Sequence, residues 1–208
     1  MADTYKTVQI CAKDEFVEKK SRFIGHAAPA ASEAQARAFI EQIRSRYWDA
    51  SHHVYAYVLR AGGVTRFSDD GEPSGTAGMP VLEVIRREDV SDVVVVVTRY
   101  FGGTLLGAGG LIRAYAKGAK IGLDAARIIT MATYARFSLG CDYHSYGKVE
   151  NLLHAEGALI EDTVFEADVK LTFLLPAPKQ DAFVKKLTEL SAGTLSPAYL
   201  TSLYRQMP

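Results

Sequence analysis

The sequence predicts an α+β protein of two domains, 1–127 and 128–208. Two observations carry this prediction. The first domain alternates strand patterns with helical patterns and contains the most apolar stretch of the chain, five valines at 93–97. The second domain follows a different order: a long strand, a helix, two strands, a helix and a final strand. At 208 residues, the chain is long enough to bury a sizeable core without disulfides or metals.

In the first domain the patterns give the order β-β-α-β-β-α-β-α. We expect strands over 5–10, 23–27, 53–60, 64–68 and 93–97, and helices over 32–48, 79–89 and 111–126. Ser32 is the expected N-cap of the first helix, and Pro80 fits the first turn of the second. Apolar side chains recur at helical spacing in the first helix at Ala34, Ala38, Phe39, Ile43 and Tyr47.

In the second domain the order β-α-β-β-α-β predicts a ferredoxin-like unit, a four-stranded antiparallel sheet with two helices on one face. Gly157 and Gly193 are expected to close its two helices. We expect strands over 128–142 and 195–204, two strands within 158–176 that turn near Glu166, and helices over 143–157 and 177–193.

The composition is that of an ordinary globular protein, with 48% hydrophobic and 23% charged residues. The formal net charge is zero, which argues against a uniformly basic surface but is compatible with one local basic face. No apolar run reaches the ~18 residues of a membrane span, and residues 1–16 contain no signal core. We therefore expect a cytoplasmic protein without a membrane partner. Cys11 and Cys141 are far apart and lack metal-ligand spacing, so we expect no structural disulfide.

The segment TRYFGGTLLGAGG, residues 98–110, follows the valines directly and leads into a helix. Glycines allow a ligand to approach the backbone closely, and a helix start offers unpaired N–H groups to an anion. With Arg99 beside them, Gly102 and Gly103 are candidates for phosphate binding. The spacing matches neither a Walker loop nor a dinucleotide fingerprint. The alternative is that these glycines only permit tight packing between the strand and the helix.

The acidic loop DDGE contains three carboxylates within four positions: Asp69, Asp70 and Glu72. Such a cluster is a candidate site for a divalent cation. It lacks the evenly spaced oxygen ligands of a calcium loop, and a solvated turn set by Asp-Gly and Glu-Pro explains it equally well.

Two histidines, His52 and His53, are adjacent on a predicted strand, so their side chains point to opposite faces. They cannot easily bind one metal together, and one packed and one exposed histidine is the simplest interpretation. A single functional histidine, as a general base or a phosphate contact, remains open.

Basic and aromatic residues occur together in two segments, and arginine with aromatic rings suits single-stranded nucleic acid. The alternative is scattered, solvated charge. The candidate residues are Lys19, Lys20, Arg22, Arg99, Tyr100, Phe101, Arg113 and Lys117.

The stretches 67–85 and 94–115 resemble the IMPACT/YigZ family, and the upstream segments KKSRFIGH and ASHHVYAY agree with it. The family signature, Arg-aromatic-aromatic-Gly-Gly-x-x-Leu-Gly, is matched throughout from Arg99 to Gly107. The resemblance implies a first domain like domain IV of elongation factor G and a second domain like domain V of that factor. Eukaryotic members regulate translation through a kinase that phosphorylates an initiation factor.

The leading hypothesis is a non-catalytic protein, without a cofactor, that regulates translation through contact with RNA or the ribosome. No serine, cysteine or threonine lies in a recognised nucleophile motif, so the evidence for an enzyme is thin. One alternative is an enzyme that acts on a nucleotide or another phosphate-bearing small molecule with a metal held by the acidic loop. A second alternative is a protein-interaction module that restrains a translation factor or a kinase.

Overall fold

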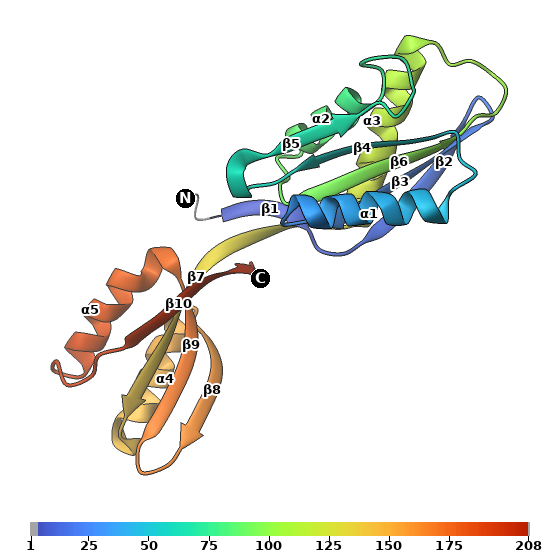
Figure 1. The fold of residues 1–208 in the computed structure, drawn as a ribbon. Helices are drawn as coiled ribbons and strands as arrows, with labels where there is room; N and C mark the ends of the chain where they lie inside the picture. The colour runs from blue at the N-terminus through green and yellow to red at the C-terminus, as the bar shows by residue number, and fades with distance from the viewer. Residues whose placement is uncertain (1–3, 208) are drawn as a thin grey trace. The chain divides into compact units, whose positions relative to one another are not determined.

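The computed structural model describes residues 4–207, which form two β-sheets and five α-helices (Figure 1). The predicted α+β class is confirmed. Contacts divide the chain into a first unit, Tyr5–Thr130, and a second unit that begins at Met131. None of the helices within residues 4–207 combines the length and the apolarity that a membrane span requires.

The first unit contains a five-stranded sheet in the order β2-β3-β6-β4-β5, in which all neighbours are antiparallel. The order β-β-α-β-β-α-β-α recurs from β2 to α3, but the first predicted strand, 5–10, corresponds to β1 (Thr4–Val8), and β2 was not predicted. The elements from β2 to α3 are β2 (Ala12–Glu18), β3 (Ser21–Pro29), α1 (Glu33–Arg46), β4 (His52–Val58), a 3-10 turn (Ala61–Gly63), β5 (Thr65–Ser68), α2 (Gly78–Arg87), β6 (Val93–Tyr100) and α3 (Ala108–Ala125).

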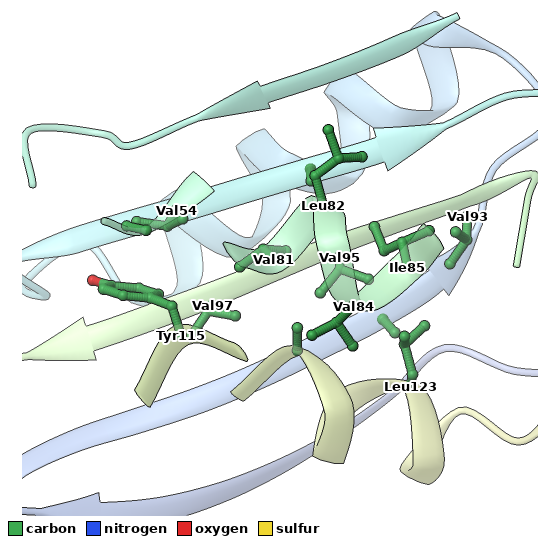
Figure 2. Packing of buried hydrophobic residues seen from close by; sticks show 14 of the residues in the cluster. Val54, Val81, Leu82, Val84, Ile85, Val93, Val95, Val97, Tyr115 and Leu123 are labelled. Carbon is green, nitrogen blue, oxygen red and sulfur yellow. The ribbon is translucent and has the colours of Figure 1, made fainter. Parts of the chain in front are cut away.

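Strand β6 lies at the centre of this sheet and is buried on both faces. Val93, Val95 and Val97 pack in one core with α2 and α3, which Figure 2 shows from close by. Val94 and Val96 pack in a second core against α1. The run of valines is therefore explained by burial on both sides, because neither face of the strand meets water. The strand also continues beyond the predicted end at 97 to Tyr100.

The N-terminal strand differs from its prediction. A strand β1 (Thr4–Val8) is present, but it pairs with β7 of the other sheet, and Ile10 lies beyond its end. The edge strand of the first sheet is instead β2, whose sequence AKDEFVE is mostly charged and exposed. Charged side chains are typical of edge strands because they discourage pairing with other chains, and they hide the apolar alternation that a prediction needs. A two-residue turn, Lys19-Lys20, joins β2 to β3, and both lysines have positive φ, 44° and 65°.

Helix α1 begins as predicted, since the Ser32 side chain accepts a hydrogen bond from the Gln35 N–H at 3.3 Å. The predicted apolar face is partly wrong, because Ala34 and Ala38 are exposed. The side chains that this helix buries are Ala36, Phe39, Ile40 and Ile43.

The second unit has the predicted β-α-β-β-α-β order. Its elements are β7 (Ile128–Cys141), α4 (Tyr143–Ala155), β8 (Leu159–Phe165), β9 (Val169–Pro176), a 3-10 turn (Ala177–Lys179), α5 (Gln180–Leu190) and β10 (Ala198–Gln206). The strand order β10-β7-β9-β8 is antiparallel throughout and is that of the ferredoxin-like unit. Alternate residues of β7 and β9 share one core with both helices, so α4 and α5 cover the same face.

One buried histidine links the stability of the first unit to pH. His26 on β3 is 3% exposed, and its Nε2 atom has no hydrogen-bond partner among the described residues. Burial, reinforced by the nearby charges of Lys13 and Arg46, lowers the pKa of His26 from 6.5 to about 4. A group whose pKa is lower in the folded state than in the unfolded state makes the protein less stable as the pH falls between those two values.

We predict that His26 destabilises the protein by about 2 kcal/mol between pH 7 and pH 5, since each pKa unit corresponds to about 1.4 kcal/mol. Thermal melts of a His26→Gln variant should show a smaller loss of Tm over this range than the parent protein. The matched control is His144→Gln, which replaces an exposed histidine on α4. Equal pH dependence of the two variants would contradict the assignment.

Candidate functional site

Three stretches selected from the sequence meet at one end of the first sheet: the histidines of β4, the acidic loop and the end of β6. In the antiparallel register, Arg99 lies opposite His52 on β4 and opposite Phe23 on β3. The loop after β5 brings Glu72 to both Arg99 and His52. The three stretches therefore converge, whereas their role in ligand binding stays a prediction.

Arg99 is buried at the point where the three stretches meet, with only 4% of its surface exposed. Its Nη1 lies 2.6 Å from Glu72 Oε1, and its Nη2 donates to Ser21 Oγ at 3.3 Å. The guanidinium also lies near two rings, 5.4 Å from the centroid of Phe23 and 5.3 Å from that of Phe101. Arg99 is therefore already paired with a carboxylate, which argues against the phosphate contact that the sequence suggested. The guanidinium is paired with the acidic loop through Glu72 and not through Asp69 or Asp70.

Glu72 has a second donor from α3. The Tyr115 hydroxyl donates to the same Oε1 atom at 2.7 Å, while Oε2 has no hydrogen-bond partner within the described part of the chain. Burial, followed by the hydrogen bond to this carboxylate, raises the pKa of Tyr115 well above its usual range. Tyr115 is therefore held as a neutral donor at physiological pH, and Glu72 joins β6, α3 and the acidic loop.

The two histidines lie on opposite faces of β4, as predicted. His53 is buried, and its Nε2 lies 3.0 Å from the Tyr47 carbonyl oxygen. His52 is half-buried on the other face, with Nδ1 2.8 Å from the Asp70 carbonyl oxygen and Nε2 3.8 Å from Glu72 Oε1. His53 is thus fixed by the α1 side of the sheet, while His52 belongs to the site.

The carboxylates of the acidic loop do not converge on a metal. Asp69 accepts three backbone N–H groups, from Gly75, Ala77 and Gly78, at 2.8–3.0 Å, and these bonds keep its pKa below the usual value although burial opposes them. Asp70 binds Arg44 at 2.9 Å and the His53 N–H at 2.6 Å. Residues 4–207 contain no group of three or more His, Cys, Asp or Glu placed to hold a metal ion. The described residues therefore do not form the divalent-cation site that Asp69, Asp70 and Glu72 suggested.

The glycines of the signature serve two different purposes. A Cβ on Gly102 would lie 2.1 Å from the backbone carbonyl of Lys20, so only glycine permits this approach to the β2–β3 turn. The Gly102 N–H donates to Ser21 Oγ at 3.2 Å and fixes the same contact. Gly107 has φ 71° and is the N-cap of α3, which has no side-chain cap and no acidic residue in its first turn. Gly103 also has a positive φ and is exposed.

A cavity of about 480 Å³ opens beside the Arg99–Glu72 pair, and we name it the Arg99 cavity. We call the polar lining residues His52, Glu72 and Arg99 its floor and the exposed apolar residues Phe101 and Leu105 its rim. This combination and this size are typical of ligand sites. The lining residues are Ser51, His52, Glu72, Pro73, Arg99, Phe101, Leu105, Leu106, Gly107, Ala108 and Leu111.

Apart from Arg99, the basic residues selected from the sequence divide into two groups. Arg22 is bound by Glu15 at 2.7 Å and lies over the ring of Tyr100, whose hydroxyl donates to Asp49 at 2.8 Å. Arg22 and Tyr100 are therefore already engaged. The others lie along a second cavity of about 220 Å³, which we name the basic groove, and Lys20 lies next to it in the turn. The groove is lined by Phe16, Glu18, Lys19, Leu106, Gly110, Arg113, Ala114 and Lys117.

Several residues of this site were not identified from the sequence, among them Ser21, Leu105, Leu106 and Tyr115. The leucines lie within the signature, but their exposure appears only once the loop is placed beside the cavity. Ser21 and Tyr115 contribute through contacts 78 and 43 residues distant in sequence, which no local pattern marks.

Because Arg99 and Glu72 form a buried ion pair, we predict that Arg99 is needed for the stability of the fold. Arg99→Ala leaves the Glu72 carboxylate buried with one donor fewer, and breaking a buried pair costs about 3–5 kcal/mol. We therefore expect a large loss of Tm in thermal melts, and Arg99→Lys should recover only part of it because it lacks the planar fork. The matched control, Arg113→Ala, removes an exposed arginine and should leave Tm nearly unchanged. An Arg99→Ala protein as stable as this control would contradict the structural role.

Comparisons with known proteins agree on one family. Residues 19–123 match the Impact N-terminal domain, and residues 139–194 match a domain of unknown function (DUF1949). The chain is 38% identical over 194 residues to IMPACT family member YvyE of Bacillus subtilis (strain 168), covering 93% of this chain and 89% of that protein. It is 39% identical over 180 residues to IMPACT family member YigZ of Escherichia coli (strain K12), covering 85% and 88%.

A solved structure is also similar to this chain, and a eukaryotic protein is similar to part of it. A solved structure described as the crystal structure of a hypothetical protein aligns with a TM-score of 0.62 at 34% identity, covering 97% of this chain and 99% of that one. The protein IMPACT homolog of Dictyostelium discoideum is 36% identical over 95 residues, which is 43% of this chain and 27% of that protein. The two domain matches and the bacterial relatives show that this chain belongs to the IMPACT family.

Proposed function

We propose that this protein is a non-catalytic RNA-binding protein that acts in translation, either on free single-stranded RNA or on RNA of the ribosome. The observation that carries the proposal is the basic groove. Lys19 from the β2–β3 turn meets Arg113 and Lys117 from α3, two segments that are far apart in sequence.

The cations of the groove are available to a ligand. Lys19, Arg113 and Lys117 are exposed, and none of them has an ion pair with a carboxylate among residues 4–207. Glu18 is the single carboxylate in the lining. In a chain with zero formal net charge, this grouping gives the local positive potential that a phosphate backbone requires.

Aromatic and apolar groups complement the charge. Lys117 lies over the ring of Phe16 with Nζ 4.2 Å from the centroid, so the groove combines an ammonium group with an apolar wall. The exposed ring of Phe101 lines the neighbouring Arg99 cavity, and Leu106 lines both. Proteins that bind single strands use this combination, in which charge follows the backbone and rings stack on bases.

The groups beside the groove favour binding over acid–base catalysis. Arg99 neutralises Glu72, and Tyr115 is held protonated because burial raises its pKa. A general acid or base works best with a pKa near the operating pH. Tyr115 is far from that condition, so these buried residues give the site its shape.

We predict that replacing Lys19, Arg113 and Lys117 together by glutamine weakens RNA binding and lowers its salt dependence. Each phosphate contact on a single strand contributes about 0.7 to the slope of log affinity against log salt, so three lost contacts should reduce the slope by about 2. Fluorescence polarisation with a labelled uridine-rich 12-mer, between 50 and 200 mM salt, measures both effects. Co-sedimentation with ribosomes tests the same variant on structured RNA.

The matched control removes the same charge from the second unit. Lys148, Lys170 and Lys185 are exposed there, and replacing them by glutamine should leave the affinity and the slope unchanged. Equal behaviour of the two triple variants would refute the groove as the binding surface. RNA binding that does not depend on salt would refute phosphate recognition.

A further inference from the structure

The rim of the Arg99 cavity is apolar and exposed, which suits contact with an aromatic ring. Phe101 is 48% exposed and Leu105 is 82% exposed, although both are large apolar residues. Leu106 and Leu111 complete the apolar lining. In proteins that bind single strands, aromatic rings stack on nucleobases. Every base can stack in this way, so the choice among bases depends on the polar groups of the site.

The floor of the cavity is electrically balanced, which limits the class of ligand. The carboxylate of Glu72 lies 2.6 Å from the guanidinium of Arg99, and both are buried. A cationic amine would therefore find the carboxylate already neutralised, and an anion would meet the same carboxylate. Burying a full charge beside a balanced pair costs more free energy than burying a neutral polar group. A neutral ligand with hydrogen-bonding groups fits this floor better than an ion.

Two acceptors on the floor make no hydrogen bond among the described residues, and neither does one buried donor, the Arg99 Nε–H. Glu72 uses only Oε1 for Arg99 and Tyr115, which leaves Oε2 without a hydrogen bond among the described residues. His52 Nδ1 lies 2.8 Å from the Asp70 carbonyl oxygen, and because a carbonyl only accepts, Nδ1 carries the proton in the neutral ring. His52 Nε2 is then an acceptor as well. Two neighbouring acceptors require two neighbouring donors.

We propose that the Arg99 cavity binds a guanine ring, with its N1–H and N2 amino group donating to Glu72 and His52 and its face against Phe101. Among the four RNA bases, guanine alone presents two adjacent donors on its Watson–Crick edge. This inference rests on the proposed function, because the guanine would be an unstacked base of the RNA strand held by the basic groove. Leu106 lines both cavities, so a strand in the groove passes the mouth of the Arg99 cavity.

The test compares four uridine-rich 9-mers that differ only in the central base: guanine, inosine, adenine or uracil. Inosine keeps N1–H but lacks the N2 amino group. Polarisation titrations should give about tenfold tighter binding for guanine than for adenine or uracil, within the range for a paired contact to a base, with inosine between them. This comparison uses the unmodified protein, so it does not depend on the folding of a variant. Equal affinity for guanine and adenine would overturn the proposal.

A rim variant tests the location. Phe101→Ala should reduce binding of the guanine 9-mer about tenfold, as expected for the loss of one stacked ring, and should remove most of the preference. The matched control is Phe67→Ala, which removes an exposed phenylalanine from β5 and should change neither. A guanine preference that survives Phe101→Ala would place the base elsewhere.

Calorimetry with free GMP and AMP separates failure of this inference from failure of the proposed function. RNA binding that requires the groove lysines but shows no base preference keeps the proposed function and overturns the guanine assignment. Binding of GMP over AMP, lost in Phe101→Ala, with no RNA binding keeps the assignment and makes a free nucleotide the source. Absence of both overturns both.

Discussion

The buried ion pair between Arg99 and Glu72 holds the site together. It connects the end of the central strand to the acidic loop, and Tyr115 adds helix α3 through the same carboxylate oxygen. Ser21 extends the network to β3, because its hydroxyl accepts from both Arg99 and the Gly102 N–H. Four elements therefore depend on one pair of charges. Such a pair is costly to desolvate and is stable only when its remaining hydrogen bonds are made, so the geometry around it is narrowly specified.

The central strand supplies the rigidity that this pair needs. Because β6 is buried on both faces and paired on both edges, its last residues leave the sheet from a fixed position. The signature loop then runs between two cavities, with Phe101 and Leu105 on one and Leu106 common to both. A rigid strand end followed by a surface loop is a frequent basis for binding sites.

Local features of the fold were predictable from the sequence, whereas partners distant in sequence were not. Helix α1 was predicted because its cap and its spacing are local properties of residues 32–46. Strand β2 was missed because an edge strand of charged residues carries no apolar alternation, and β1 was assigned to the wrong sheet because pairing is not a local property. Arg99 was selected from the sequence, but it is buried through contacts with Glu72 and Ser21, and no pattern within the signature reveals those contacts.

In the turn between β2 and β3, the dipeptide Lys19-Lys20 supplies positive charge but has a backbone conformation that lysine disfavours. Lys19 and Lys20 both have the left-handed backbone conformation, which asparagine and glycine adopt with little strain. For a lysine, this conformation costs roughly 1 kcal/mol. A turn rebuilt by Lys19→Asn with Lys20→Gly would fit this backbone better and would also remove a cation from the groove. Selection for thermal stability alone would therefore drive these two positions away from lysine. Their persistence in a laboratory evolution experiment would report selection for the charge itself.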